Sequence, residues 1–462
     1  MNYAAKGMLT DLYELTMMQA YIDAGMNHTA AFEFFVRRLP ANRNFLIAAG
    51  LEQLLDYLRR VHFSTDDIHW LNSTGVFNRR FLKYLERFRF RGDVDAMPEG
   101  TVFFPNEPIV RITAPISQAQ LVETRVINLL QFQTLIASKA IRCVLAAPDK
   151  SLVDFGLRRT HGSDAGMLGA RACYIAGFSA TSNVLAARQS DIPLSGTMAH
   201  SFIQACDAEE EAFLKFARAN RHNVVLLLDT YDTEAAAVKV VQLAPKLRKL
   251  GIRIKGIRLD SGDLADHARK VRRILDDGGL QQTSIFASGN LDENSLRQLT
   301  TANAPIDGYG VGSRVLTSAD APYLDCAYKL QEYAGRPRCK LSETKATLPG
   351  AHQVFRYHHQ GTGEFATDTI DLATNIEPGA PLLIPAMRRG KVLAVHPPLQ
   401  HIRNVVMQQV ASLPAPLRSL EPAPPYPVTI SKPLQQLAAR LGVIVHANDG
   451  MKTIEATARG RY

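Results

Sequence analysis

A histidine surrounded by small residues is the first feature of the sequence that suggests chemistry. His200 lies in the stretch "SGTMAHSF", which follows "NVLAARQSDIP", a pattern typical of a helix end and a turn. A neutral imidazole nitrogen is a good phosphoryl acceptor, and neighbouring backbone or hydroxyl donors can hold the phosphate. A lone histidine in such a turn also commonly serves as a structural hydrogen-bonding group. The residues alone leave both interpretations open.

Charged and small polar residues follow four strand-like segments in the middle of the chain, namely "LLLDT", "GIRLDSGD", "IFASGN" and "GYGVGSR". Active sites of barrels and open α/β sheets lie at such strand ends. Asp263 and Asn290 can instead cap the helices that follow them. Four such ends together favour an active site. The residues are Asp229, Arg258, Asp260, Ser261, Gly262, Asp263, Ser288, Gly289, Asn290, Gly310, Gly312 and Ser313.

The last two of these turns have the small residues that suit phosphate binding. Small side chains let backbone N–H groups near a helix N-terminus approach an anion closely. No G-K-[ST] follows "GVGS", and no G-x-G-x-x-G is present there. The pattern therefore favours phosphate binding without a known nucleotide-binding motif.

The elements that must position these residues divide the chain into three regions. Residues 1–140 mix helical and strand-like patterns and predict an α+β domain. Residues 141–345 alternate short apolar strands, from "LVDFG" to "DCAYKL", with amphipathic helices. This alternation predicts parallel βαβ units in a barrel or a doubly wound sheet. Residues 346–462 return to mixed strand and loop, and their Pro-rich "LPAPLRSLEPAPPYP" predicts an extended linker or a surface wrap.

The charge of the 462-residue chain indicates the kind of partner. With 53 Lys and Arg against 44 Asp and Glu, the net charge of +9 suggests an anionic partner. The arginines are scattered as pairs, and no long basic block or RNA-binding aromatic motif is present. Anionic small molecules are therefore favoured over nucleic acid.

The cysteines and the apolar segments indicate the compartment. The five cysteines are far apart and form no C-x-x-C pair, so neither a disulfide framework nor a zinc site is expected. No run of about 18 apolar residues occurs, and the N-terminal residues lack the order of a signal peptide. We expect a cytoplasmic enzyme with no membrane partner.

Seven short motifs occur in one order along residues 8–356. They are "LTDLYELTM", "FEFFVRRLP", "FGLRR", "TSNV", "GTMAHSF", "RLDSGDL" and "KLSE…TLPG". Together they resemble nicotinate phosphoribosyltransferase, and the likeness weakens beyond residue 356. The resemblance implies an enzyme of NAD biosynthesis that joins nicotinate to phosphoribosyl pyrophosphate, giving nicotinate mononucleotide and pyrophosphate with coupled ATP hydrolysis. It also implies an irregular α/β barrel beside a smaller mixed α+β domain built from the N- and C-terminal regions, in a homodimer with shared sites.

The resemblance assigns roles to particular residues. His200 matches the histidine that ATP phosphorylates, and Thr197 matches the neighbouring threonine that contacts nicotinate. Arg258 matches an arginine at the nicotinate site, where its guanidinium can pair with the pyridine carboxylate through two contacts. Tyr13 matches a tyrosine that packs on the nicotinate ring from the partner subunit. Without the resemblance, Tyr13 would be interpreted as a core aromatic of a helix.

Further site residues follow from the same resemblance. Arg158 of "FGLRR", more than Arg159, is expected to face the anionic substrates. Asp260 is expected to hold either the ribose hydroxyls or a Mg²⁺ ion that carries pyrophosphate. The turn "GVGS" matches the phosphate-binding turn "GIGT" of the family, which gives the phosphate contacts to Gly312 and Ser313.

The chain departs from the family pattern at two places. Ser313 replaces the threonine of "GIGT" and keeps a hydroxyl donor. Asp154 stands where glutamate is usual before "FGLRR", and "RRTHG" replaces the more usual "RRAQG", so a difference in geometry is expected near Arg158. Two alternatives stay open. A nicotinamide or quinolinate phosphoribosyltransferase would share the barrel and the phosphate turn, and a non-catalytic barrel could bind phosphorylated metabolites.

Overall fold

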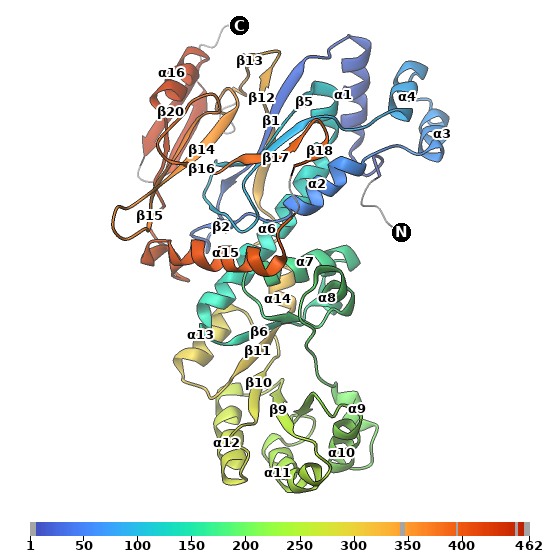
Figure 1. Ribbon diagram of the computed structural model, residues 1–462, viewed down its shortest axis with the longest axis vertical. Helices are drawn as coiled ribbons and strands as arrows, with labels where there is room; N and C mark the ends of the chain where they lie inside the picture. The colour runs from blue at the N-terminus through green and yellow to red at the C-terminus, as the bar shows by residue number, and fades with distance from the viewer. Residues whose placement is uncertain (1–5, 342–346, 394–395, 449–450, 457–462) are drawn as a thin grey trace. The chain divides into compact units, whose positions relative to one another are not determined.

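The chain forms two compact units, which Figure 1 shows as ribbons. This computed structural model describes residues 6–341, 347–393, 396–448 and 451–456. The first unit comprises residues 1–138 and 323–462, and the second comprises residues 139–322. The motif "KLSE…TLPG" lies partly outside the described residues, because these omit residues 342–346.

The second unit is built on a six-stranded sheet with the order β7-β6-β11-β10-β9-β8. All of its neighbouring strands are parallel, and helices connect them, which confirms the predicted α/β class. The strands are β6 (Ser151–Asp154), β7 (Ala180–Thr181), β8 (Val224–Leu227), β9 (Ile254–Leu259), β10 (Ser284–Ala287) and β11 (Gly308–Val311). The helices are α7 (Ser163–Ile175), α8 (Val184–Ser190), α9 (His200–Gln204), α10 (Glu209–Ala219), α11 (Thr233–Lys249), α12 (Leu264–Asp277), α13 (Glu293–Thr301) and α14 (Ser313–Leu316), with the 3-10 helix η1 (Leu157–Arg159).

The segment before α9, residues 194–196, extends this sheet beyond its edge strand β7. Leu194 forms a parallel bridge with Thr181 of β7. Two residues later, the carbonyl oxygen of Gly196 accepts a hydrogen bond from the side chain of Asn223, just before β8, at 3.4 Å. The segment therefore contacts β7 at one edge of the sheet and the residue before β8 at the other edge, as expected for an irregular barrel.

One strand predicted for the parallel sheet belongs to the other unit. β12 (Asp325–Tyr333) contains "DCAYKL" and pairs antiparallel with β1 (Thr29–Arg38). Stacking of Tyr328 on Phe32, with ring centroids 5.0 Å apart, helps to fix this pairing. The apolar pattern correctly predicted a strand, but it contains no information about the strand that would become its partner.

The first unit is a mixed α+β structure made from both ends of the chain. Its larger sheet has the order β13-β12-β1-β5-β3-β17-β18, and a second sheet has the order β16-β14-β15-β19. The remaining strands are β2 (Leu46–Ile47), β3 (Asp93–Ala96), β4 (Val102–Phe103), β5 (Pro108–Pro115), β13 (Arg336–Pro337), β14 (His352–His358), β15 (Phe365–Leu372), β16 (Ala380–Pro381), β17 (Ile384–Arg388), β18 (Lys391–Val392), β19 (Val428–Ile430), β20 (Val443–Asn448) and β21 (Met451–Ala456). The helices are α1 (Leu12–Asp23), α2 (Leu51–Arg60), α3 (Thr65–Ser73), α4 (Arg79–Glu86), α5 (Ile116–Leu121), α6 (Glu123–Ala146), α15 (Leu399–Ala411) and α16 (Lys432–Arg440), with the 3-10 helix η2 (Ala415–Arg418).

Helix α6 is the longest apolar helix in the described part of the chain. It is long and apolar enough to cross a membrane, with a mean hydropathy of 1.2, but 78% of its most apolar window is buried inside the protein. Two of its polar side chains form hydrogen bonds inside the protein, since the hydroxyls of Ser138 and Thr134 accept hydrogen bonds from the backbone N–H groups of residues 47 and 49. These features are typical of a core helix.

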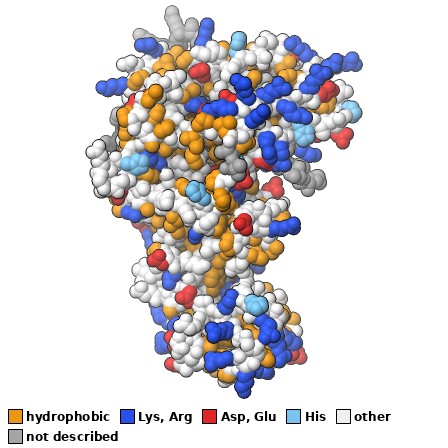
Figure 2. Space-filling model, viewed as in Figure 1, with side chains coloured by type: hydrophobic (Ala, Val, Ile, Leu, Met, Phe, Trp, Pro, Cys, Tyr) orange, Lys and Arg blue, Asp and Glu red, His pale blue; other side chains and the backbone are white. Residues whose placement is uncertain are grey.

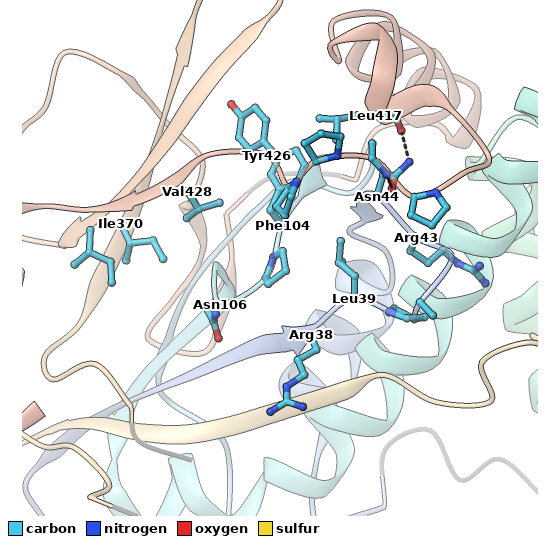
Figure 3. A pocket seen from close by; sticks show the side chains of 18 of the residues that line it. Arg38, Leu39, Arg43, Asn44, Phe104, Asn106, Ile370, Leu417, Tyr426 and Val428 are labelled. Atoms are coloured by element: carbon cyan, nitrogen blue, oxygen red, sulfur yellow. Dashed lines mark hydrogen bonds between the residues drawn. The ribbon is translucent and has the colours of Figure 1, made fainter. Parts of the chain in front are cut away.

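The Pro-rich stretch near residue 420 is held by one asparagine. The side-chain amide of Asn44 contacts the carbonyl oxygens of Leu417, Ser419 and Glu421, and its oxygen accepts a hydrogen bond from the backbone of Ala423. This stretch borders a cavity of the first unit, whose volume is about 340 Å³. Figure 3 shows the side chains that line it. The stretch is therefore a surface wrap, one of the two forms predicted for it.

The excess of positive charge is not confined to one part of the chain. Figure 2 shows Lys and Arg side chains on this face of both units, with Asp and Glu side chains among them. In the second unit, ion pairs join Lys239 to the buried Glu209 at 3.1 Å and Lys270 to Asp266 at 2.6 Å. The exposed Lys270–Asp266 pair contributes little to stability.

Candidate active site

Ten of the twelve strand-end residues predicted from the sequence line one cavity of the second unit; Asp229 and Asp263 do not, and Asp263 caps α12 instead. The volume of this cavity is about 1120 Å³. The turns that line it follow β6, β9, β10 and β11, because the carboxyl ends of parallel strands share one edge of the sheet. Six predicted site residues line the cavity: Arg158, Thr197, Arg258, Asp260, Gly312 and Ser313.

His200 lies beside this cavity as the first residue of α9. Its Nδ1 shares a hydrogen bond with the hydroxyl of Thr230 at 3.1 Å, and its Nε2 lies 3.9 Å from a carboxylate oxygen of Asp260. The second distance is too long for a hydrogen bond. The side chain is 37% exposed, and Thr197 and the two residues after it line the cavity. The predicted phosphoryl acceptor thus lies next to the predicted substrate site and is not buried away from it.

Arg258 is the most buried cation of this site. Burial lowers the pKa of its guanidinium, and the nearby carboxylates of Asp260 and Asp229 oppose that shift. Its Nε is buried and has no hydrogen-bond partner among the described residues. A buried guanidinium with an unused donor favours an anionic ligand, since leaving that donor unpaired is costly.

The turns after β9 and β10 interlock at Asp260. The hydroxyl of Ser288 donates a hydrogen bond to the Asp260 carboxylate. A Cβ atom on Gly289 would lie 2.1 Å from the backbone oxygen of Asp260, and the φ of Gly289 is +103°. Both facts require glycine at this position. The turn that carries Asp260 is therefore held by close backbone packing as well as by a side-chain hydrogen bond.

The glycines of "GYGVGS" have a packing role in addition to the predicted one. A Cβ on Gly310 would lie 2.4 Å from the ring of Phe155, and one on Gly312 would lie 2.6 Å from the Phe155 carbonyl oxygen. The turn after β11 thus needs small residues to pass the end of β6. Gly312 and Ser313 still line the cavity, so the packing requirement and a phosphate contact are compatible.

The unusual Asp154 supports the turn that carries Arg158. It is buried, and its carboxylate accepts hydrogen bonds from the hydroxyl of Thr181 at 2.7 Å and from the backbone N–H of Gly156 at 2.8 Å. Burial raises the pKa of Asp154. Arg158 itself is exposed on η1 and lines the cavity. The shorter aspartate therefore still anchors the backbone next to this arginine.

Tyr13 belongs to the first unit, on α1, and is not among the residues that line the cavity. Its side chain is 44% exposed, so it is not the core aromatic that its helical pattern alone suggests. Its hydroxyl donates to the buried carboxylate of Glu14 at 3.3 Å. The expected contribution of Tyr13 to a partner's site stays a prediction.

One carboxylate lines the cavity where a Mg²⁺ ion would bind, and a second lies behind the same turn. No group of three or more His, Cys, Asp or Glu side chains able to hold a metal occurs among the described residues. Mg²⁺ commonly uses one or two carboxylates together with substrate phosphates and water. Asp260 lines the cavity, and a buried oxygen of Asp229 has no hydrogen-bond partner in the described part of the chain. These residues fit an ion that arrives with a phosphorylated substrate.

Thr230 is a site residue that the sequence analysis missed. The available signal was its position directly after Asp229, at the end of an apolar strand. Its contact with His200 joins residues thirty positions apart, and no local pattern predicts it.

Comparisons with known proteins agree with the sequence motifs. The chain matches the nicotinate phosphoribosyltransferase N-terminal domain over residues 8–131, the nicotinate phosphoribosyltransferase family over residues 150–337 and the C-terminal domain over residues 373–438. A Mycobacterium tuberculosis nicotinate phosphoribosyltransferase, pncB2, is 46% identical over 458 residues, with 98% of each chain covered. The chain belongs to the nicotinate phosphoribosyltransferase family. A Bacillus subtilis nicotinate phosphoribosyltransferase is 40% identical over 373 residues, which are 79% of this chain and 75% of the relative.

Solved structures of similar fold include the human member of this family. Human nicotinic acid phosphoribosyltransferase superimposes with a TM-score of 0.84 at 28% identity and covers 94% of this chain and 100% of its own. A nicotinate-nucleotide pyrophosphorylase from Pyrococcus furiosus superimposes with a TM-score of 0.71 at 26% identity, over 88% of this chain and 95% of its own. Both matches extend over the two units of this nicotinate phosphoribosyltransferase family member.

Proposed function

We propose that this protein joins nicotinate to phosphoribosyl pyrophosphate in NAD biosynthesis and couples the reaction to ATP hydrolysis through phosphorylation of His200. The observation that carries the proposal is the cavity in which Arg258, Thr197 and Asp260 meet a glycine-serine turn beside His200. The family membership supports the transferase reaction. The position of the histidine supports the phosphoryl step.

The site would bind one substrate at each side of the cavity. Arg258 would pair with the carboxylate of nicotinate, using the buried Nε that has no partner among the described residues. Thr197 would contact the same ring. Gly312, Ser313 and Arg158 would hold the phosphates of the second substrate. The sugar would then lie near Asp260.

The transfer step needs positioning more than a protein nucleophile. The lone pair of the nicotinate ring nitrogen forms the bond to C1 of the ribose, and the electron pair of the C1–oxygen bond leaves with pyrophosphate. Positive charge develops on the sugar and negative charge on the leaving group, so fixed charges and in-line placement lower the barrier. A Mg²⁺ ion held with the phosphates by Asp260 or Asp229 would neutralise part of the pyrophosphate charge.

The phosphoryl step would use the exposed edge of the imidazole. A nitrogen of neutral His200 attacks the γ-phosphorus of ATP, the bond from that phosphorus to the β–γ bridging oxygen breaks, and ADP leaves. Water later cleaves the nitrogen–phosphorus bond and releases inorganic phosphate. The phosphohistidine adds about two negative charges beside Asp260, by analogy with other phosphorylated side chains.

We also propose a cytoplasmic homodimer in which Tyr13 reaches the site of the partner subunit. The match of Tyr13 to the family tyrosine supports this, and its 44% exposure on α1 leaves the ring accessible to another chain.

The test measures labelling and transfer in the same preparation. Incubation with γ-labelled ATP and Mg²⁺ is expected to give an acid-labile, base-stable label on the peptide that contains His200. His200→Ala should abolish the label and the ATP hydrolysis, yet retain slow phosphoribosyl transfer because the other positioning groups remain. Pyrophosphate release should require nicotinate.

Three kinds of result would contradict the proposal. Normal labelling of His200→Ala, or a label on a peptide that lacks His200, would make this histidine a structural group. Pyrophosphate release with nicotinamide or quinolinate and not with nicotinate would assign a different base. Binding of nicotinate without any turnover would indicate a non-catalytic barrel.

A further inference from the structure

Backbone hydrogen bonds join neighbouring strand-end turns at two places around the cavity of the second unit. The backbone N–H of Ser288, after β10, donates to the carbonyl oxygen of Leu259, the last residue of β9, at 2.8 Å. The backbone N–H of Phe155, after β6, donates to the carbonyl oxygen of Val311, the last residue of β11, at 2.9 Å. The turns after β10 and β6 are therefore each held to a neighbouring strand by the backbone itself.

The turns after β10 and β11 are not joined in this way. The pairing of β10 with β11 ends at Ala287 and Tyr309. In the described part of the chain, no backbone hydrogen bond joins residues 288–292 to residues 312–314. Both segments contribute residues to the lining of the cavity. A side-chain contact must therefore set the spacing between these two turns.

An ion pair between Arg314 and Asp292 makes this contact. The Nη1 of Arg314 lies 2.6 Å from Oδ2 of Asp292. Arg314 directly follows Ser313 at the start of α14, and Asp292 is two residues beyond Asn290. Neither partner lines the cavity, and the side chain of Asp292 is 11% exposed whereas that of Arg314 is 49% exposed. The pair thus joins the two turns just behind their cavity-lining residues.

Asp292 is a fixed and charged partner for this arginine. Its Oδ1 accepts hydrogen bonds from the backbone N–H groups of Asn294 at 3.1 Å and Ser295 at 3.0 Å, which caps α13. The hydroxyl of Ser295 accepts the backbone N–H of Asp292 at 2.8 Å. Burial opposes the charged form of Asp292, but hydrogen bonds from Ser295 and Arg314 outweigh it and lower the pKa of this carboxyl. The start of α13 therefore holds Asp292 in place, and Asp292 holds Arg314.

We propose that Arg314 and Asp292 are positioning residues that set the spacing between the turns after β10 and β11, and thereby the affinity of the cavity for phosphoribosyl pyrophosphate. The inference rests on the proposed function, in which Gly312 and Ser313 contact the phosphates of that substrate. Donors in a turn bind an anion well only where their spacing matches it. Loss of the ion pair should therefore weaken binding of the phosphorylated substrate more than binding of nicotinate.

The experiment is a double-mutant cycle in which pyrophosphate release gives kcat and the KM of each substrate. Arg314→Gln should raise the KM for phosphoribosyl pyrophosphate roughly 3- to 10-fold, as for the net loss of one hydrogen bond. Asp292→Asn removes the charge but keeps an equally good helix cap. It should raise this KM less, because the half-exposed Arg314 can be solvated, whereas Arg314→Gln leaves a mostly buried carboxylate without its cation.

Two further variants complete the cycle. The double variant should be no more impaired than Arg314→Gln alone, because one substitution already breaks the pair. Arg314→Lys keeps a cation and should restore most of the wild-type KM. In all of these variants the KM for nicotinate should change little.

A matched control pair lies at the other end of β10. Arg272 and Asp276 form an ion pair at 2.8 Å on α12, and Arg272 also donates to the carbonyl oxygen of Thr283, just before β10. Arg272→Gln and Asp276→Asn make the same chemical changes away from the cavity. They should leave the KM for phosphoribosyl pyrophosphate unchanged even where the melting temperature falls. The melting temperature of every variant separates loss of positioning from loss of fold.

The outcomes separate this inference from the proposed function. A wild type that releases no pyrophosphate with nicotinate would refute the proposed function itself, and calorimetric titration with phosphoribosyl pyrophosphate and Mg²⁺ would then measure the same affinity without turnover. A wild-type affinity in folded Arg314→Gln and Asp292→Asn would overturn the inference, as would an equal loss in the control variants or an equal rise in the KM for nicotinate. A loss in Arg314→Gln with a wild-type value in Asp292→Asn would show that Arg314 acts on the phosphates directly and not through Asp292.

Discussion

Replacing Arg258 by lysine tests the role of the buried guanidinium. The substitution keeps one positive charge at the end of β9 but removes the planar fork that can make two hydrogen bonds to one carboxylate. Activity with nicotinate should fall, whereas activity with nicotinamide, which lacks the carboxylate, should change little. The preference for nicotinate is therefore the quantity that should change.

The expected magnitude follows from the surroundings of the side chain. Burial lowers the pKa of Arg258, and its Nε has no partner among the described residues, so a ligand carboxylate would meet a donor that is poorly solvated. Loss of one charge-assisted hydrogen bond in such a place costs about 2–3 kcal/mol. That corresponds to a decrease in kcat/KM for nicotinate of roughly 30- to 150-fold.

The assay is pyrophosphate release with each base, performed at matched melting temperature. Arg253→Lys is the control, because Arg253 is exposed just before the same strand and takes no part in the cavity. An Arg258→Lys protein with wild-type kcat/KM for nicotinate would refute the assignment. An equal decrease for nicotinate and nicotinamide would show that the arginine acts on the fold or on the phosphates and not on the carboxylate.

Three further predictions concern other parts of the molecule. Burial raises the pKa of the Glu14 carboxyl group to about 7, so the folded state binds the proton of this carboxyl more tightly than the unfolded chain does. The resulting stabilisation is fully present below about pH 4.5 and is lost as the pH rises through 7. Between pH 5 and 8.5, the free energy of unfolding of the wild type should therefore fall by about 2–3 kcal/mol relative to that of Glu14→Gln, as measured by thermal unfolding. Parallel plots of this free energy against pH for the two proteins would contradict the prediction. Gly289→Ala should lower the melting temperature and the activity far more than Gly361→Ala, which has a similar φ of +97° but open space around it; equal effects would exclude the steric argument. Tyr13→Ala and His200→Ala homodimers should both be impaired, yet subunit exchange between them should restore activity, and no recovery after confirmed exchange would mean that one chain builds each site.

The residues at the strand ends were predictable because the rule behind them is local. A short apolar strand followed by a polar turn identifies both the element and the edge at which its side chains lie. Arg258, Asp260 and Ser313 could therefore be assigned to one site before their distances were known. Their meeting around a single cavity required only that β6, β9, β10 and β11 be parallel neighbours, which the alternation with helices indicated.

The contacts that cross between elements were not predictable in the same way. The hydrogen bond between Thr230 and His200 depends on how α9 approaches the end of β8, and the pairing of β12 with β1 depends on packing in the other unit. The glycines of "GVGS" illustrate a related limit. The small residues of this turn predicted an anion site. The structure adds a second reason for glycine at position 312, because a side chain there would collide with the backbone at the end of β6.

The charges around the cavity set a condition on its ligands. Arg258 and Arg158 attract anions, but Asp260 lies at the same edge, with Asp229 directly behind its turn. A pyrophosphate group near these carboxylates would be repelled unless a cation accompanied it. A phosphoryl group on His200 would face the same carboxylate at short range. We therefore expect both proposed steps to use a divalent cation at the Asp260 turn, whose position is held by Asp229 and by packing against Gly289.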